Sequence, residues 1–155
     1  MKDKIIIYTD GAARGNPGPA GWGVVIIDGK KIFEMGGVSK HATNNQMELT
    51  GPIEALKHLK KDKINTPLEI FSDSKYVILG ITEWVFNWQK NNWRNAAKKP
   101  VLNKELWEEL YKFSQQFKIK WTYVEGHMSH KYNERADEIA TNFADGIKIK
   151  LKKEK

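Results

Sequence analysis

A short apolar run near the start of the chain constrains its fold more than any other feature. Residues 5–9 (IIIYT) are almost continuously apolar, which is typical of a strand that is buried on both faces. The run ends at Asp10-Gly11, and a segment rich in glycine and proline, read as a turn, follows it. A strand of this kind belongs to a sheet with helices on either side, so the run predicts a layered α/β domain.

The remaining patterns complete such a domain. Four more strands are expected, at residues 22–27, 31–37, 68–72 and 119–124, and Asp28-Gly29 joins the first two of them as a hairpin. Helices are expected from residues 43–45, over 74–81 and 83–91, from Asn103, and after the loop at 125–133. This order predicts a five-stranded mixed sheet flanked by helices. We expect one domain over residues 1–146 and a basic, flexible tail over residues 147–155.

Charge and the absence of cysteine limit what this chain can bind. Its net charge of +7 indicates a partner such as nucleic acid or an anionic membrane, or only solubility through lysine, because 26 cationic side chains include just three arginines. Without cysteine, a metal ion must bind through oxygen or imidazole. No apolar run approaches the ~20 residues that span a bilayer. The first residues offer no cleavage site for a signal peptide, so we expect a cytoplasmic protein without a membrane partner.

Four acidic residues stand at similar places in the expected elements. Asp10 and Asp73 end the first and fourth strands, and Glu48 and Asp137 lie in the early turns of two helices. If those strands are parallel neighbours, Asp10 and Asp73 lie about 5 Å apart, and they repel unless a cation lies between them. Mg²⁺ suits such oxygen ligands, and a pair of ions can activate water and stabilise a leaving oxygen.

Each acid also has an ordinary structural explanation. Asp10-Gly11 is a turn sequence, and Asp73 suits the cap of the following helix. Glu48 is placed to close a capping box with Asn45, and Asp137 complements the positive end of its helix. Taken one at a time, these explanations are favoured, so the surrounding sequence has to decide.

The sequence around the acids resembles type 1 ribonuclease H in four collinear blocks: TDGAARGNPGPAGWG (9–23), TNNQMEL (43–49), SDSKYV (72–77) and GHMSHKYNERADEIA (126–140). Residues 84–107 are similar to the basic protrusion of bacterial members. The resemblance implies a ribonuclease H-like fold and an RNA–DNA hybrid duplex as partner. It implies an endonuclease that hydrolyses the RNA strand by a two-metal-ion mechanism, leaving 5′-phosphate and 3′-hydroxyl ends. The implied cofactor is Mg²⁺, with Mn²⁺ as a substitute, and we expect a monomer.

The same resemblance assigns the catalytic residues. It implies that four carboxylates bind the metal ions: Asp10, Glu48, Asp73 and Asp137. His127 matches a histidine on a mobile loop that is implicated in proton transfer or product departure. The preceding glycine favours His127 over His130 for this role.

Substrate contacts are implied in two places. On the body of the domain they are Asn16, Asn44 and Asn45 for 2′-hydroxyl groups, and Thr43 and Asn103 for a phosphate of the DNA strand. On the protrusion they are Trp84, Trp88, Lys90, Arg94, Lys98 and Lys99. The chain departs from the family at His41, which replaces the usual arginine of the phosphate pocket. Trp84 and Trp88 are spaced i, i+4, so a core position is equally open to them, and at least one is expected to be partly buried.

Two other functions stay open. Another nuclease or a strand transferase with the same fold, such as a junction resolvase or a transposase core, uses similar acids. The asparagine-containing blocks and the basic protrusion argue against it. A non-catalytic module that binds hybrids is the second, and the presence of all four acids argues against that.

Overall fold

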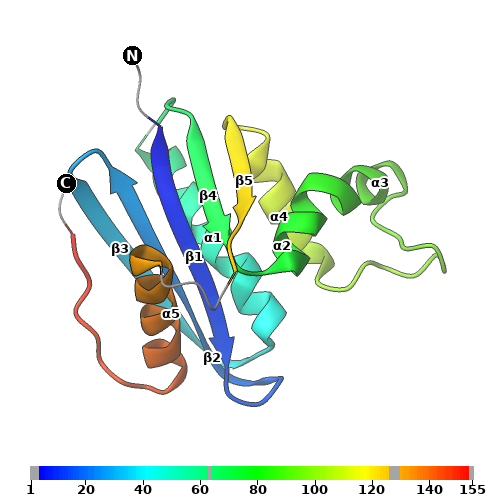
Figure 1. Cartoon of the computed structure of the whole chain (residues 1–155). Helices are drawn as coiled ribbons and strands as arrows, with labels where there is room; N and C mark the ends of the chain where they lie inside the picture. The colour runs from blue at the N-terminus through cyan, green and yellow to red at the C-terminus, as the bar shows by residue number, and fades with distance from the viewer. Residues whose placement is uncertain (1–3, 63, 126–129, 154–155) are drawn as a thin grey trace.

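The computed structural model describes residues 4–62, 64–125 and 130–153, and its strands form a single mixed sheet (Figure 1). Within the described residues the strands are β1 (Ile5–Ala13), β2 (Gly18–Asp28), β3 (Lys31–Ala42), β4 (Leu68–Ser72) and β5 (Ile119–Tyr123). Their order across the sheet is β3-β2-β1-β4-β5. The pairs β1–β2 and β2–β3 are antiparallel, whereas β1–β4 and β4–β5 are parallel. The expected five-stranded mixed sheet is confirmed, and so is the parallel pairing of the first and fourth strands.

Helices cover both faces of this sheet. They are α1 (Asn44–Lys61), α2 (Lys75–Leu79), the π-helical turn η1 (Gly80–Trp84), α3 (Val85–Lys90), α4 (Lys104–Ser114) and α5 (Lys131–Ala144). Figure 1 shows α1 behind the sheet and α5 in front of it. Side chains of β1 alternate between the two layers: Ile5 and Ile7 pack with the core of α1 and α4, and Tyr8 packs with Ile139 of α5. The near-continuous apolar run therefore contributes side chains to two hydrophobic cores, one on each face of the sheet.

The segment rich in glycine is mostly strand, which differs from the expected turn. β1 continues to Ala13 and pairs with β2 as far as Ala20, so the chain reverses only between these residues. Glycine in β2 is required by helix α5. A Cβ atom on Gly21 would lie 2.5 Å from the carbonyl oxygen of Ala140, and one on Gly23 would lie 2.4 Å from that of Ala136. The glycines let α5 pack directly on the backbone of β2.

Helix α1 runs as one element through Gly51-Pro52, although proline disrupts the hydrogen bonding of a helix interior. Pro52 has no N–H group, so it leaves the carbonyl of Glu48 without its usual helical donor, yet α1 continues to Lys61. A Cβ atom on Gly51 would lie 3.2 Å from the Cβ of Thr9. The close approach at Gly51 brings the first half of α1 against β1.

The tail that was expected to be flexible lies along β3 as far as the structure describes it (Figure 1). The backbone N–H of Glu34 donates to the carbonyl of Lys152 over 2.7 Å, and Phe33 forms an isolated bridge with Lys153. Ile149 and Leu151 pack on the core between the sheet and α5. The apolar residues of the tail therefore face the core, and its backbone bonds to β3. None of the helices in the described part has the length and apolar content needed to cross a membrane.

Candidate active site

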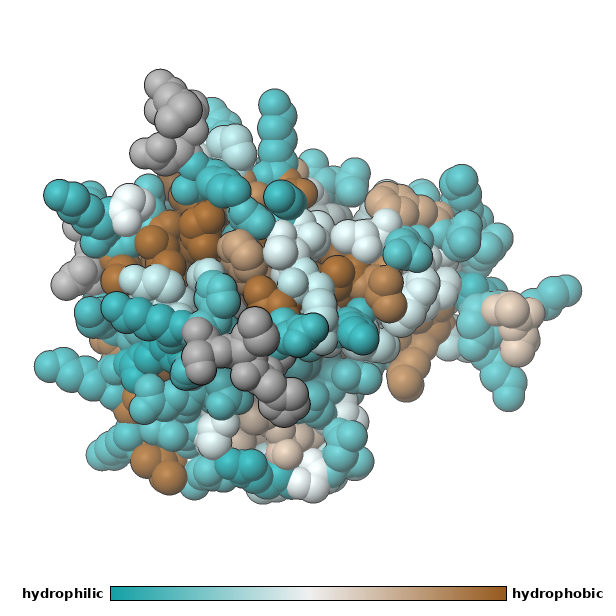
Figure 2. Space-filling model, in the orientation of Figure 1, coloured by the Kyte–Doolittle hydropathy of each residue, from teal (hydrophilic) through white to brown (hydrophobic). Residues whose placement is uncertain are grey.

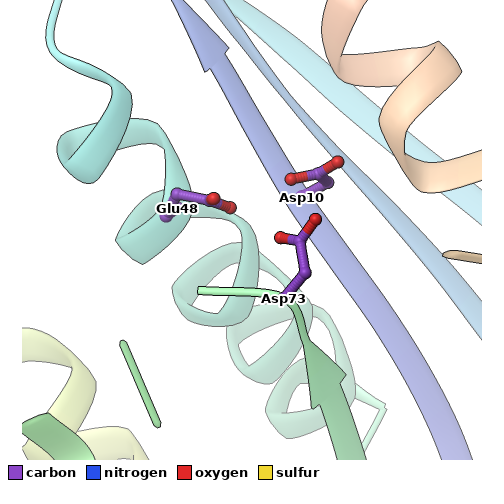
Figure 3. Close-up of side chains that lie close together, drawn as sticks. All are labelled: Asp10, Glu48 and Asp73. Carbon is purple, nitrogen blue, oxygen red and sulfur yellow. The ribbon is translucent and has the colours of Figure 1, made fainter. Parts of the chain in front are cut away.

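Three elements bring three of the four acids together at one end of the parallel strands. Asp10 lies in β1, Asp73 follows the end of β4, and Glu48 lies in α1. Each offers an oxygen, and these oxygens lie within 4.8 Å of one another (Figure 3). The juxtaposition follows from the pairing of β1 with β4 and from the packing of α1 on β1.

The ordinary explanations of these acids do not hold in the structure. Asp10 pairs with Gly23 inside the β-ladder, so it is not a turn residue. Ser74 caps α2 by accepting from Val77, so Asp73 does not serve as that cap. The capping box of α1 is formed by Thr43 and Gln46, which corrects the expectation that Asn45 and Glu48 form one. Turn formation and helix capping therefore do not account for these three carboxylates.

Burial makes this cluster electrostatically unfavourable without a cation. Asp10 is 4% exposed and Glu48 is 6% exposed. Burial, followed by the charges of Glu48 and Asp73, raises the pKa of Asp10 far above its ordinary value. Burial and the charge of Asp73 also raise the pKa of Glu48. The backbone N–H of Gly11 donates to Asp10 over 2.9 Å, but Glu48 Oε1 is buried without a hydrogen-bond partner.

Asp137 lies next to the cluster rather than inside it. It is exposed on α5, and its hydrogen bond and charge contribute to the raised pKa of Asp10. His127 lies outside the described residues. His130 is the N-cap residue of α5, and its ring centroid lies 5.5 Å from that of Tyr8. The position of α5 thus places a fourth carboxylate beside Asp10.

The donor set fits a hard divalent cation. All three clustered groups are carboxylates, and two of them are buried, so an added positive charge would relieve both their repulsion and the cost of burying them. The orphaned Glu48 Oε1 would gain a partner at the same time. The three residues are therefore able to hold a metal ion.

The residues of the domain body that are expected to contact substrate gather around the start of α1, the helix that carries Glu48. Thr43 is the N-cap of this helix, and the Asn16 side chain accepts from the backbone N–H of Asn44 over 2.9 Å. Asn45 is half-buried in the first turn, and Asn103 precedes α4. Gln46 donates to Asn103 over 3.3 Å, which ties the two helix starts together. Four of these five residues thus belong to one connected set: Asn16, Thr43, Asn44 and Asn103.

The protrusion has an aromatic base and a basic tip. Trp84 and Trp88 are both half-buried, and their ring centroids lie 5.8 Å apart. Trp88 also packs on the buried Trp107 at 5.5 Å, which confirms the expected partial burial. The tip carries four exposed cations: Lys90, Arg94, Lys98 and Lys99. Figure 2 shows hydrophilic side chains gathered on this lobe, beyond α3.

Sequence reasoning missed two groups of residues. Gln46 and Tyr76 hold the side chain of Asn103, and the Thr43-x-x-Gln46 spacing was an available signal of the capping box. Glu34 and Arg135 form a buried ion pair between β3 and α5. These two lie 101 residues apart in sequence, so no local pattern pointed to their pairing.

Comparisons with known proteins agree with this geometry. The family model described as RNase H matches residues 2–145. The ribonuclease H of Bradyrhizobium diazoefficiens is 48% identical over 143 residues, covering 92% of this chain and 89% of the relative. The ribonuclease H of Erythrobacter litoralis is 47% identical over 142 residues, covering 92% of this chain and 96% of the relative.

Solved structures are similar as well. LC9-RNase H1, a type 1 RNase H with the type 2 active-site motif, is 26% identical with a TM-score of 0.84, over 96% of this chain and 75% of the other. LC11-RNase H1 in complex with RNA/DNA hybrid is 31% identical with a TM-score of 0.72, over 92% of this chain and 98% of the other. The sheet order, the acidic cluster and these likenesses lead to one conclusion: the chain belongs to the ribonuclease H family.

Proposed function

We propose that this protein is an endoribonuclease that hydrolyses the RNA strand of RNA–DNA hybrids and leaves 5′-phosphate and 3′-hydroxyl ends. The observation that carries the proposal is the cluster of Asp10, Glu48 and Asp73, whose oxygens lie within 4.8 Å in a chain of the ribonuclease H family. A structural relative, LC11-RNase H1, has been solved in complex with RNA/DNA hybrid. All of the proposed carboxylate ligands come from one chain, which favours a monomer as the active form.

The carboxylates would bind Mg²⁺, with Mn²⁺ as a substitute. Asp10, Glu48 and Asp73 form the inner group, and Asp137 joins it from α5. When bound, a pair of such ions activates water and stabilises the leaving oxygen in phosphodiester hydrolysis. In the free protein, the raised pKa values of Asp10 and Glu48 mean that the pair retains protons which cation binding would displace. His127 would transfer a proton or assist product departure.

Substrate recognition would divide between the body and the protrusion. The amides of Asn16, Asn44 and Asn45 can both donate to and accept from a 2′-hydroxyl group, which DNA lacks. Thr43 and Asn103 would take a phosphate of the DNA strand. The exposed cations of the protrusion would attract phosphates without regard to sequence, and its tryptophans would pack against sugars: Lys90, Arg94, Lys98, Lys99, Trp84 and Trp88.

A cleavage assay on matched duplexes tests the proposal. RNA–DNA, RNA–RNA and DNA–DNA duplexes of one sequence, each strand labelled in turn, are incubated with Mg²⁺ and with EDTA. We expect cleavage of the RNA strand of the hybrid alone, only with the ion, and products that carry 5′-phosphates. Comparable cutting of duplex DNA would indicate a different nuclease of the same fold. Tight hybrid binding without cleavage would indicate a binding module, and either result would overturn the proposal.

A further inference from the structure

A chain of side-chain hydrogen bonds crosses the surface beside the acids and joins three helices. The backbone N–H of Thr43 donates to Gln46 Oε1 over 2.8 Å, and Gln46 Nε2 donates to Asn103 Oδ1 over 3.3 Å. Asn103 Nδ2 then donates to Tyr76 Oη over 3.1 Å. The indole N–H of Trp107 donates to the same hydroxyl over 2.9 Å. The bonds thus connect the start of α1 to the start of α4 and to α2.

Asn103 owes its conformation to these neighbours rather than to its own helix. Its φ is +61°, in the left-handed region, which asparagine tolerates better than most residues with side chains. It occupies the N-cap position of α4, yet its side chain makes no capping bond to that helix. The two ends of its carboxamide are instead engaged by Gln46 and by Tyr76. Its orientation is therefore set from α1 and α2.

The hydroxyl of Tyr76 has a position that the core determines. Trp107 is fully buried, and its indole N–H needs an acceptor there, because an unpaired buried donor is costly. Gly80 makes room for the indole, since a Cβ atom on Gly80 would lie 2.0 Å from the ring. Tyr76 supplies the acceptor and so becomes a fixed point between the buried indole and the surface amide of Asn103.

We infer that Tyr76 and Gln46 are positioning residues for substrate binding, which together set the separation and orientation of Thr43 and Asn103. The inference rests on the proposed function, in which Thr43 and Asn103 take one phosphate of the DNA strand. Each keeps a hydrogen to donate. The Thr43 hydroxyl accepts from the backbone N–H of Gln46 over 3.1 Å and retains its own proton, and the Asn103 amide has a second N–H. The N-terminus of α4, without a side-chain cap, adds a favourable potential for an anion.

A phosphate scan measures this directly. In a set of hybrids, each DNA phosphate is replaced in turn by a neutral methylphosphonate. The contacted phosphate is the one whose replacement raises KM most for the unmutated protein but has no effect on KM for Asn103→Ala. Tyr76→Phe keeps the ring and removes only the acceptor. We expect it to raise KM for unmodified hybrid about fivefold, the effect of one hydrogen bond, with kcat changed by less than about twofold. The methylphosphonate penalty should vanish at the contacted phosphate alone, because the two changes remove the same interaction.

Two further variants keep the result decisive. Tyr111→Phe is the matched control, since Tyr111 is half-buried on α4 and its ring contacts Phe86 and Trp93, and it should keep the full penalty. Gln46→Met removes the hydrogen bond to Asn103 from the side of α1 and should also abolish the methylphosphonate penalty. This variant tests the inference if circular dichroism shows that Tyr76→Phe is unfolded. A full penalty in folded Tyr76→Phe, or a lower kcat with unchanged KM, would overturn the inference. An unmutated protein that does not cleave hybrid would instead count against the proposed function.

Discussion

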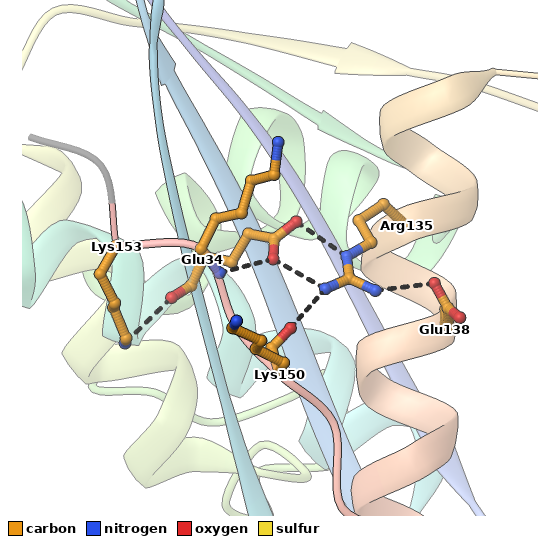
Figure 4. Close-up of polar contacts among 6 residues, drawn as sticks. Glu34, Arg135, Glu138, Lys150 and Lys153 are labelled. Atoms are coloured by element: carbon orange, nitrogen blue, oxygen red, sulfur yellow. Dashed lines mark hydrogen bonds and ion pairs between the residues drawn. The ribbon is translucent and has the colours of Figure 1, made fainter.

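The acidic cluster and strand β3 both bury carboxylates, and they neutralise them in opposite ways. At the acidic cluster, Asp10 and Glu48 face other carboxylates, and the pKa of each is raised. On β3, Glu34 is just as buried at 3% exposure, but the guanidinium of Arg135 donates to its two oxygens over 2.8 and 2.9 Å (Figure 4). The pKa of Glu34 is lowered, because hydrogen bonds from Arg135 and Lys152 outweigh its burial.

The tail completes the second region. The backbone N–H of Lys152 donates to Glu34 over 2.9 Å, and Arg135 donates to the carbonyl of Lys150 over 2.8 Å. Glu34 thus receives its countercharge from within the chain, whereas the acidic cluster could receive it from a metal ion. Glu34 is therefore a buried acid that contributes to stability. Asp10 and Glu48 are buried acids that lower the stability of the metal-free protein and are suited to binding a cation.

Asp10→Asn should have the largest effect, and it acts on activity. The amide keeps the shape of the side chain but removes the charge that holds the ion, so Mg²⁺-dependent cleavage of hybrid should fall by roughly 10³-fold. Relief of repulsion should also raise the metal-free melting temperature, measured by circular dichroism. Asp73→Asn is the parallel variant for activity. Near-normal cleavage by either would remove that residue from the site.

Glu34→Gln should lower stability and leave activity unchanged, which is the reverse of the effect of Asp10→Asn. It removes the negative charge that neutralises the half-buried guanidinium of Arg135, so urea denaturation should show a free energy of unfolding lower by about 3 kcal/mol. Cleavage below the melting temperature should stay normal. Glu138→Gln is the control, because Glu138 bonds the same arginine over 2.8 Å with a side chain that is 57% exposed, and it should cost less than about 1 kcal/mol. Equal losses in the two variants would show that burial of the pair is not the cause.

The two regions should also respond to pH with opposite signs. Because the pKa values of Asp10 and Glu48 are raised, the metal-free fold loses stability as pH rises above their ordinary values near 4 and towards the raised values. Because the pKa of Glu34 is lowered, its contribution is present above 4.5 and is lost as pH falls through the lowered value. Melting curves recorded across this pH range, with and without Mg²⁺, measure the pH dependence of stability for both regions. A metal-free profile that Asp10→Asn does not flatten would contradict the first.

Ending the chain after Gly146 should have the smallest effect. It removes the tail's bonds to Glu34 and Arg135 and the apolar contacts of Ile149 and Leu151 but leaves the ion pair, so the free energy of unfolding should fall by about 2 kcal/mol. Lys150→Ala should change little, because only the backbone carbonyl of Lys150 accepts from Arg135. A loss as large as that of Glu34→Gln would mean that the tail, rather than the ion pair, holds α5 to β3.

Sequence alone determined the features that depend on neighbouring residues. The run at residues 5–9, the hairpin at Asp28-Gly29 and the helical stripes established a mixed sheet with flanking helices, because periodicity and turn chemistry act over a few residues. The four acids were predicted as metal ligands in the same way, since each stands in a block that resembles ribonuclease H. Asp10 and Asp73 were also expected to meet, because parallel neighbours end at one edge.

Only the tertiary structure decided how distant residues share their charge and hydrogen bonds. It placed Glu48 with Asp10 and Asp73, and it made Gln46 rather than Glu48 the partner of the helix cap. It paired Glu34 with Arg135 across 101 positions and laid the basic tail along β3, a position that the composition of the tail did not indicate. The physical reason is that a buried charge takes the partner that packing brings within about 3 Å, and packing depends on the whole sheet rather than on local sequence.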